Sequence, residues 1–258
     1  MNGKLIGEGN QPLICTPLIG KDQDAILLEL ENVLGKNPDI IEWRADFYER
    51  IVDTHEVVAT ANQIKEIAGT IPVIFTIRSI HEGGQPTPLS INEAVDLMGA
   101  ICCNTNVEYV DCELSNLPAN IKKLRRIASE NNTKIIASFH DFNQTPNQEI
   151  LLQKFMDATK QGADVAKLAV MSKTLSDVLT LLKVTLDAKN MLDIPIITIS
   201  MGEYGALTRL IGGVFGSAVT FAVGQNSSAP GQLPIEDLRL ALSIVQKSLG
   251  DQRSSFTP

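Results

Sequence analysis

One stretch of the chain reads Asp164-Val165-Ala166-Lys167-Leu168-Ala169-Val170-Met171, a short apolar run with a single lysine in its middle. A run of this length and composition is typical of a buried strand. An ammonium group inside such a strand is costly unless it is paired or neutralised. The stretch therefore predicts a strand that carries either a reactive amine or a lysine whose stem packs on apolar neighbours while its amine reaches water.

The alternation of a strand with a helix recurs along the chain. Eight strand-like segments are separated by amphipathic helical segments, and the strand centres are Ile14, Ile41, Ile74, Tyr109, Ile136, Val165, Ile197 and Val219. Capping residues mark the helix starts: Ser90 with Glu93 forms a capping-box pattern, and Thr145-Pro146 predicts a threonine cap with proline at the first helical position. Eight such units in 258 residues predict an α/β fold, a (β/α)8 TIM barrel, rather than an open doubly wound sheet.

We expect this barrel to form one domain over residues 1–258, with the barrel proper at about 12–249. Residues 1–11 are mostly polar and contain glycine, so they predict a short N-terminal extension that forms a hairpin across one end of the barrel. Residues 234–249 predict the last helix, and residues 251–258 a loose tail.

The composition limits the possible functions. The formal net charge of -8 leaves no basic stripe for phosphates, so we expect no nucleic-acid partner. No apolar run reaches the roughly 18 residues of a membrane span, and the N-terminus lacks a signal-peptide core. These features predict no membrane association and a cytoplasmic location. The four cysteines and three histidines show neither CxxC nor HxxxH spacing, so we expect no metal and no cofactor.

Charged and hydroxyl side chains gather at the ends of the second to seventh strands. They are Glu42, Arg44, Asp46, Thr76, Arg78, Asp111, Glu113, Ser138, His140, Lys167, Thr198 and Ser200, with Glu82 in the loop after the third strand. In a (β/α)8 barrel the carboxyl ends of the strands form the active face. The pattern therefore predicts a polar site at the barrel mouth, centred on Lys167.

These groups fit the chemistry of an imine. A neutral lysine amine attacks a ketone or aldehyde, and a neighbouring imidazole such as His140 can then move a proton. An ordinary lysine is almost wholly protonated at pH 7, so we expect burial and the positive charges of Arg44, Arg78 or Arg209 to favour the neutral amine. Arginine also pairs with carboxylates through two hydrogen bonds, which predicts an anionic substrate.

Six motifs occur in order, and together they resemble type I 3-dehydroquinate dehydratases, which form a Schiff base with their substrate. The motifs are Glu42-Trp43-Arg44-Ala45-Asp46, Arg78-Ser79-Ile80-His81-Glu82-Gly83-Gly84, Ser138-Phe139-His140-Asp141-Phe142, Lys167-Leu168-Ala169-Val170-Met171, Arg209-Leu210 and Ser227-Ser228-Ala229-Pro230-Gly231-Gln232. The resemblance extends from about Pro12 to Leu249.

The resemblance implies a lyase that dehydrates 3-dehydroquinate to 3-dehydroshikimate by syn elimination of water, in the shikimate pathway of aromatic amino acid biosynthesis. Lys167 would form an imine with the C3 ketone, His140 would take the C2 proton and help the C1 hydroxyl leave, and Glu82 would orient His140. Arg209 would bind the C1 carboxylate. The other substrate contacts that the resemblance implies are Glu42, Arg44, Arg78, Met201, Ser228 and Gln232, the last two on a lid loop at 224–233. It also implies a homodimer.

Several alternatives stay open at this point. Asp46 either touches substrate or forms a salt network with Arg44 and Arg78, and Asp111 orients its neighbours. Trp43, on the face opposite Glu42, is expected to pack between the barrel and the helices. The rival functions are another lysine-imine barrel, such as an aldolase or transaldolase, and a binding barrel without turnover.

Overall fold

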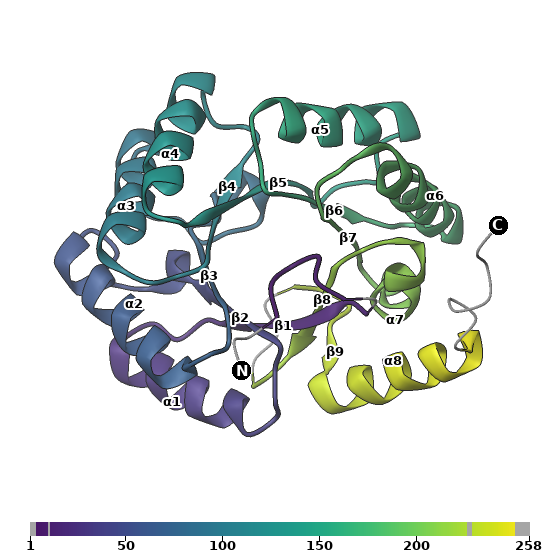
Figure 1. Cartoon of the computed structure of the whole chain (residues 1–258), viewed down its shortest axis with the longest axis horizontal. Helices are drawn as coiled ribbons and strands as arrows, with labels where there is room; N and C mark the ends of the chain where they lie inside the picture. Colours follow the sequence, from purple (N-terminus) through teal and green to yellow (C-terminus); the bar gives the residue numbers. More distant parts are fainter. Residues whose placement is uncertain (1–3, 10, 226–228, 251–258) are drawn as a thin grey trace.

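The computed structural model describes residues 4–9, 11–225 and 229–250. Its strands form a central ring, and the long helices surround that ring (Figure 1). The elements in chain order are β1 Leu13–Leu18, α1 Gln23–Leu34, β2 Ile40–Arg44, η1 Ala45–Phe47, α2 Thr54–Ala68, β3 Val73–Thr76, η2 Ile80–Glu82, α3 Ile91–Asn104, β4 Tyr109–Glu113, α4 Pro118–Glu130, β5 Lys134–Asp141, α5 Gln148–Lys160, β6 Val165–Met171, α6 Leu175–Met191, β7 Ile196–Met201, α7 Ala206–Phe215, β8 Val219–Val223, β9 Leu233–Pro234 and α8 Ile235–Leu249.

The sheet has the strand order β7-β6-β5-β4-β3-β2-β1-β8-β9, and its neighbouring strands are parallel. It closes where β7 meets β8, through a single bridge between Ile196 and Ser217. The ladder is short here because the Ser217 hydroxyl, rather than a backbone carbonyl, accepts the hydrogen bond from the Thr198 N–H at 3.0 Å. The predicted (β/α)8 barrel is confirmed, with its weakest seam at this junction.

Side chains that point into the barrel form layers, because alternate residues of a strand share a face. The lowest layer is apolar and consists of Ile40, Ile74, Tyr109, Ile136, Val165, Ile197 and Val219. Two residues further along their strands, β2, β4 and β6 carry Glu42, Asp111 and Lys167, all three buried. The apolar layer thus closes the barrel from below and leaves the charged groups facing the mouth.

The outward faces of the strands pack against the helices. Trp43 is 1% exposed, and its ring lies edge-on to Tyr48 and Phe75 with centroids 5.7 and 5.4 Å away. This is the position between barrel and helices that its place on β2 predicted. Aromatic pairs in this edge-to-face geometry add to the free energy of burial.

The helix caps agree with the sequence at one predicted start and differ at another. Ser90 and Glu93 form the capping box of α3. The predicted cap at Thr145 is wrong, because α5 begins at Gln148 and the Asn147 side chain accepts the hydrogen bond of the Ile150 N–H at 3.0 Å. The Thr145 hydroxyl instead donates to the carbonyl of Met171 at 2.9 Å, which fastens the β5–α5 loop to the end of β6.

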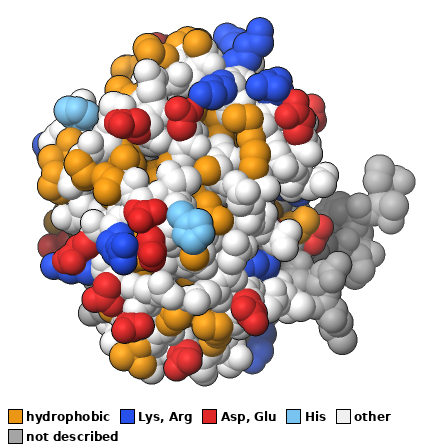
Figure 2. Space-filling model, turned by 90° about the vertical axis from the view of Figure 1, so that its left-hand side faces the viewer, with side chains coloured by type: hydrophobic (Ala, Val, Ile, Leu, Met, Phe, Trp, Pro, Cys, Tyr) orange, Lys and Arg blue, Asp and Glu red, His pale blue; other side chains and the backbone are white. Residues whose placement is uncertain are grey.

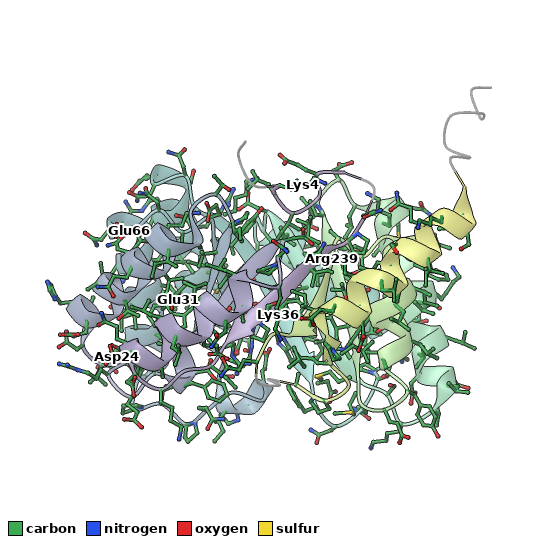
Figure 3. All side chains as sticks on the ribbon, turned by 90° about the horizontal axis from the view of Figure 1, so that it is seen from below. Lys4, Asp24, Glu31, Lys36, Glu66 and Arg239 are labelled. Carbon is green, nitrogen blue, oxygen red and sulfur yellow. The ribbon has the colours of Figure 1, made fainter. Side chains whose placement is uncertain are left out.

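The N-terminal segment covers the amino-terminal end of the barrel, as the position of Lys4 in Figure 3 shows. Leu5 and Ile6 pack against the lowest layer, and the Ile6 N–H donates to the Tyr109 hydroxyl at 2.9 Å. The described part, residues 4–9, contains a turn closed by the Glu8 N–H and the Leu5 carbonyl, not the paired strands of the expected hairpin. The expected tail at 251–258 lies outside the described residues.

Ionic contacts fasten the last helix to the first β/α unit. Arg239 on α8 lies 3.5 Å from Asp39, and Lys36, just after α1, lies 3.7 Å from Glu236 on α8 (Figure 3). The Lys36 amine also donates to the Gly224 carbonyl at 2.6 Å. These contacts hold the start of the loop after β8 against the body of the barrel.

The face drawn in Figure 2 mixes acidic, basic and apolar side chains, and no continuous basic stripe crosses the described residues in that view. None of the helices within the described ranges has the length and apolar character that crossing a membrane requires.

We expect Tyr109→Phe to loosen the N-terminal segment without changing catalysis, because it removes the hydrogen-bond partner of the buried Ile6 N–H. An unpaired buried N–H costs about 1–3 kcal/mol. Hydrogen exchange should speed up at residues 4–9, and urea unfolding should show a loss of that size. Tyr48→Phe is the matched control, since the Tyr48 hydroxyl pairs with a side chain, that of Thr60. Unchanged exchange at residues 4–9 in Tyr109→Phe would contradict this role.

Candidate active site

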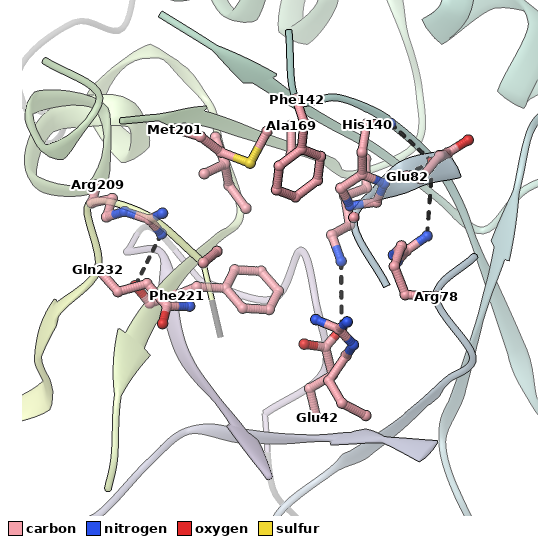
Figure 4. A pocket seen from close by; sticks show the side chains of 15 residues that line it. Glu42, Arg78, Glu82, His140, Phe142, Ala169, Met201, Arg209, Phe221 and Gln232 are labelled. Carbon is pink, nitrogen blue, oxygen red and sulfur yellow. Dashed lines mark hydrogen bonds and ion pairs between the residues drawn. The ribbon is translucent and has the colours of Figure 1, made fainter. Parts of the chain in front are cut away.

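A cavity of about 50 Å³ lies at the carboxyl ends of the strands (Figure 4). Its lining combines charged side chains from β2 to β6 with apolar side chains from β5 to β8. The lining residues are Glu42, Arg44, Arg78, Glu82, Gly83, His140, Phe142, Lys167, Ala169, Ile199, Met201, Arg209, Phe221, Ala229 and Gln232.

Lys167 is 4% exposed, and its amine points into this cavity from the middle of β6. Its Nζ lies 3.0 Å from Asp111 Oδ2, 3.5 Å from Glu42 Oε1 and 4.8 Å from the centre of the Phe221 ring. The charged groups in contact with the amine are therefore carboxylates, whereas the sequence had suggested arginines. The ammonium is held between two anions and the face of an aromatic ring.

Other polar groups of the barrel hold these two carboxylates. Thr76 donates its hydroxyl to Glu42 Oε1 at 3.0 Å, and Ser138 donates to Asp111 Oδ1 at 2.5 Å. Burial alone would raise the pKa of Asp111, but the Arg78 guanidinium and the Lys167 ammonium outweigh it and hold that pKa well below its usual range. Asp111 therefore stays an anion beside Lys167 at neutral pH.

His140 is paired with Glu82, a carboxylate other than the two that contact the Lys167 amine. Glu82 Oε2 lies 2.8 Å from His140 Nδ1 and accepts the His140 backbone N–H at 3.0 Å. The carboxylate places the ring proton on Nδ1, which leaves Nε2 with a free lone pair. Burial, with the positive charges of Arg78 and Lys167, holds the pKa of His140 well below 6.5, so the imidazole is neutral.

Glu82 itself occupies an unfavourable place for an anion. Burial and the nearby Glu113 carboxylate raise the pKa of Glu82 to about 7, against the opposing effects of Arg78 and a hydrogen bond from Ser115. Glu82 therefore gains or loses its proton close to neutral pH, as acid–base groups in active sites commonly do.

Arg78 and Arg44 are tied to protein carboxylates. Arg78 lies 2.8 Å from Asp111 and 3.0 Å from Glu113. Arg44 makes two parallel bonds of 2.8 Å to Asp46, the bidentate geometry that fixes both side chains.

Asp46 also accepts the backbone N–H groups of Arg78 and Gln85, at 3.3 and 3.0 Å. It does not line the cavity and lies in η1 rather than at the end of β2. Of the two predicted roles for Asp46, this geometry matches the salt network, because its oxygens are committed to Arg44 and to the loop after β3.

Arg209 differs from the other cations of the cavity. It is 2% exposed and donates to the carbonyls of Phe221 and Pro230 at 3.2 and 3.1 Å. Its Nε has no hydrogen-bond partner, and no carboxylate pairs with it in the described ranges. Burial lowers the pKa of Arg209 to about 10, so it is charged at neutral pH. A buried cation in this state favours an anionic ligand.

The structure brings nearly all the predicted site residues together. Met201 and Gln232 line the cavity with Lys167, and Asp111 contacts the lysine from below. Ser228 lies outside the described residues.

Sequence reasoning missed the apolar wall that Phe142, Ala169, Ile199 and Phe221 form. The alternation of strand residues carried a signal, because Ala169 and Phe142 follow Lys167 and His140 by two positions. A methyl group at Gly83, whose φ is +83°, would come within 2.2 Å of the Phe142 ring, so glycine lets this wall approach the loop of Glu82.

Groups of three or more His, Cys, Asp or Glu side chains that could hold a metal ion are absent from the described part of the chain. The chemistry available from the described side chains is that of a lysine amine, an imidazole and an arginine facing one cavity.

Comparison with known proteins gives a consistent result. A family model described as type I 3-dehydroquinase matches residues 14–249. The chain is 49% identical over 249 residues to a 3-dehydroquinate dehydratase of Aromatoleum aromaticum, covering 96% of both chains. It is 50% identical to one of Geobacillus sp. WCH70, covering 96% of this chain and 95% of the relative.

Solved structures give the same answer. A 3-dehydroquinate dehydratase from Geobacillus kaustophilus superposes with a TM-score of 0.91 at 50% identity, covering 93% of each chain. A type I enzyme from Clostridium difficile, covalently modified by comenic acid, gives a TM-score of 0.90 at 37% identity over 96% of this chain and 97% of the other. In sequence and in fold, over nearly its whole length, the chain belongs to the type I 3-dehydroquinase family.

Proposed function

We propose that the chain dehydrates 3-dehydroquinate to 3-dehydroshikimate, the reaction for which its relatives are named, through an imine on Lys167. The observation that carries this proposal is one cavity shared by three groups. They are the buried amine of Lys167, the imidazole of His140, whose Nδ1 is held by Glu82, and Arg209, which among the described residues donates to carbonyls. On one substrate ring, the ketone would face Lys167, the acidic C–H group would face His140, and the carboxylate would face Arg209.

The ion pair of Lys167 suits the imine step. The Lys167 ammonium gives up a proton, the neutral amine adds to the C3 ketone, and that proton leaves with the former ketone oxygen as water, which gives an iminium ion. Its positive charge replaces that of the ammonium, 3.0 Å from Asp111 and over the Phe221 ring. Because Asp111 remains an anion, the site stabilises the iminium without having to reorganise. The iminium then accepts the electron pair released at C2.

His140 is placed for the proton transfers of the elimination. Its Nε2 takes the C2 proton, and Glu82, which accepts the Nδ1–H, stabilises the imidazolium that results. The imidazolium then returns a proton to the C1 hydroxyl, which leaves as water on the same face of the ring. The proton gained and the proton given balance, so the step needs no other acid or base. Hydrolysis of the conjugated iminium releases the product and Lys167.

The remaining cavity residues match the two sides of the substrate ring. Arg209 binds the C1 carboxylate, and Glu42, Arg44 and Arg78 bind ring hydroxyls, while Met201 and the neighbouring apolar residues cover the hydrocarbon face. Gln232 lines the cavity from the segment after β8, and the family resemblance gives it, together with Ser228, which lies outside the described residues, the role of closing over the bound substrate.

A phosphate-binding lysine-imine barrel, such as an aldolase, fits this site less well. Gly212 and Gly213 lie within α7, where backbone N–H groups serve the helix rather than a ligand. The buried cation of this region is Arg209, whose planar fork suits a carboxylate. A binding barrel without turnover is disfavoured by the pairing of Glu82 with His140, which orients an imidazole of the cavity for proton transfer.

We also infer a homodimer of single-domain subunits that works in the cytoplasm, without nucleic-acid partners. The adjacent helices α6, α7 and α8 expose a set of apolar side chains, which are Leu179, Leu207, Val214, Leu240 and Ile244. A second copy of the chain would bury them. The free cysteines are consistent with a reducing compartment, and the charge of -8 disfavours nucleic acid.

Borohydride reduction in the presence of 3-dehydroquinate should leave a covalent adduct on Lys167, mapped by peptide mass spectrometry, alongside formation of the conjugated enone product in the absorbance assay. Lys167→Ala should lose both adduct and turnover. Lys154→Ala is the matched control, since the Lys154 amine also lies over an aromatic ring, that of Phe139, and should retain both. Turnover without an adduct would reject the imine, and binding without turnover would favour the binding barrel.

Glu82→Gln should lower the catalytic activity and raise the stability of the folded protein. The pKa of Glu82 is raised from 4.5 to about 7, so the ionised carboxylate destabilises the folded state, fully above pH 7 and hardly at all below pH 4.5. The free energy of unfolding of the variant should exceed that of the wild type by roughly 1–3 kcal/mol at pH 8.5 and by little at pH 5. The kcat should fall about 100-fold or more. A variant less stable at pH 8.5 would contradict the buried-anion account.

Light scattering should give twice the chain mass for the wild type. Leu207→Glu, on the exposed side of α7, should shift the protein toward one chain mass, because it places a charge in the apolar contact. Leu28→Glu, at a still more exposed leucine on α1, is the control and should leave the mass unchanged. A wild type of single-chain mass would reject the dimer.

A further inference from the structure

Ser115 is an exposed residue in the loop after β4, yet its hydroxyl reaches two buried carboxylates. Ser115 Oγ lies 3.1 Å from Glu82 Oε1 and 3.4 Å from Glu113 Oε2. Ser115 does not line the cavity, so it has no access to substrate. It reaches the active site through these two carboxylates, and of the two Glu82 is the one that lines the cavity.

The two oxygens of Glu82 have separate partners. Oε2 faces His140, with both the Nδ1 and the backbone N–H of that residue in reach. Oε1 accepts the Ser115 hydroxyl, whereas the Arg78 guanidinium stays 3.9 Å from Oε2. The serine therefore fixes the rotation of the carboxylate from the side opposite the imidazole. Without the hydrogen bond from Ser115 to Oε1, the carboxylate group of Glu82 could rotate and move Oε2 away from Nδ1 of His140.

A hydroxyl has one proton, so Ser115 can donate to only one of its two neighbours at a time. Glu113 already accepts two other hydrogen bonds, because its Oε1 accepts the Ser79 N–H at 2.8 Å and Arg78 Nη1 at 3.0 Å. The shorter distance also favours Glu82. The proton of Ser115 thus lies toward Glu82, between two negative charges that would otherwise face each other.

We infer that Ser115 is a positioning residue for the dehydration: its hydroxyl holds Glu82 in the orientation, and in the anionic form, that keeps His140 ready to take a proton. The inference rests on the proposed function and adds to it a residue outside the cavity.

The charges around Glu82 determine the direction of the effect. Glu113 and Asp111 on β4 and burial raise the pKa of Glu82, while Arg78 after β3 and the Ser115 hydrogen bond lower it. His140 on β5 is neutral and donates its Nδ1–H. Removing the Ser115 hydroxyl takes away one of the two groups that lower the pKa of Glu82. Glu82 then binds its proton at higher pH, and the acid limb of the kcat profile moves to higher pH with it.

The local backbone does not depend on the serine side chain. The Asn116 side chain and backbone N–H both donate to the Glu113 carbonyl, at 3.0 and 3.1 Å, and hold the turn. Because Ser115 is exposed, Ser115→Ala leaves no cavity. A loss of activity in this variant would therefore report on Glu82 rather than on folding.

The test compares kcat and KM between pH 5.5 and 9 for the wild type, Ser115→Ala, Ser115→Thr and Ser176→Ala, an exposed serine on α6. Ser115→Ala should lose about tenfold in kcat at pH 6.5 and less than about twofold at pH 8.5, which corresponds to a shift of one pH unit. Its KM should stay within about twofold of the wild type. Ser115→Thr, which keeps the hydroxyl, and Ser176→Ala should match the wild type.

Two further measurements separate positioning from a structural effect. In a Glu82→Gln background, Ser115→Ala should cause no further loss, because the group it acts through is gone. The ¹⁵N resonances of the His140 imidazole should respond to the protonation of Glu82 at higher pH in Ser115→Ala than in the wild type. An equal loss at every pH, a further loss in the Glu82→Gln background, or an unshifted ¹⁵N titration would overturn the role of Ser115. A wild type without turnover or adduct would overturn the proposed function instead, and the ¹⁵N titration would still decide whether Ser115 acts on Glu82.

Discussion

The ion pair between Lys167 and Asp111 is the interaction on which the rest of the active end depends. Two charges in a buried layer lose hydration worth several kcal/mol each, and their attraction compensates only when further hydrogen bonds complete the site. Ser138 and Arg78 complete it for Asp111, and Thr76 does so for Glu42, the second anion near the amine. Removal of Asp111 would leave Lys167 with the longer contact to Glu42, at 3.5 Å, and would take one of its carboxylate partners from Arg78.

The barrel makes this network possible because adjacent parallel strands stand in fixed register. Ser138 on β5 is paired in the sheet with Lys167 on β6 and with Glu113 on β4. Side chains separated by many residues in the chain thus lie within hydrogen-bond distance, while the apolar layer below excludes water from one side. A residue in an exposed loop can act on this network as well, as Ser115 does through Glu82.

Charge is distributed unevenly around the cavity, and this asymmetry prepares the site for one kind of ligand. Two cations, Arg44 on β2 and Arg78 in the loop after β3, are neutralised by protein carboxylates. Arg209 on α7 has carbonyl partners alone among the described residues, so its charge is left for the ligand. Apolar side chains, among them Met201 and Phe221, line the cavity between these two regions. A ligand with one carboxylate and several hydroxyls would satisfy both sides of the cavity.

Sequence patterns were enough to predict the barrel, because eight strand and helix patterns of similar length leave few other ways to bury their apolar faces. They also indicated Lys167 as the centre of the candidate site, since a lysine within the apolar run 164–171 and the order of the six motifs are local features. Local patterns could not tell which charged groups contact the Lys167 amine. The sequence suggested arginines, whereas the groups in contact are the carboxylates of Asp111 and Glu42. Only the tertiary structure revealed four further features. They are the cap of α5, the single bridge between β7 and β8, the apolar wall that includes Phe142, and the contact of Ser115 with Glu82. Each depends on distances between segments far apart in the chain, which the packing of the whole barrel sets.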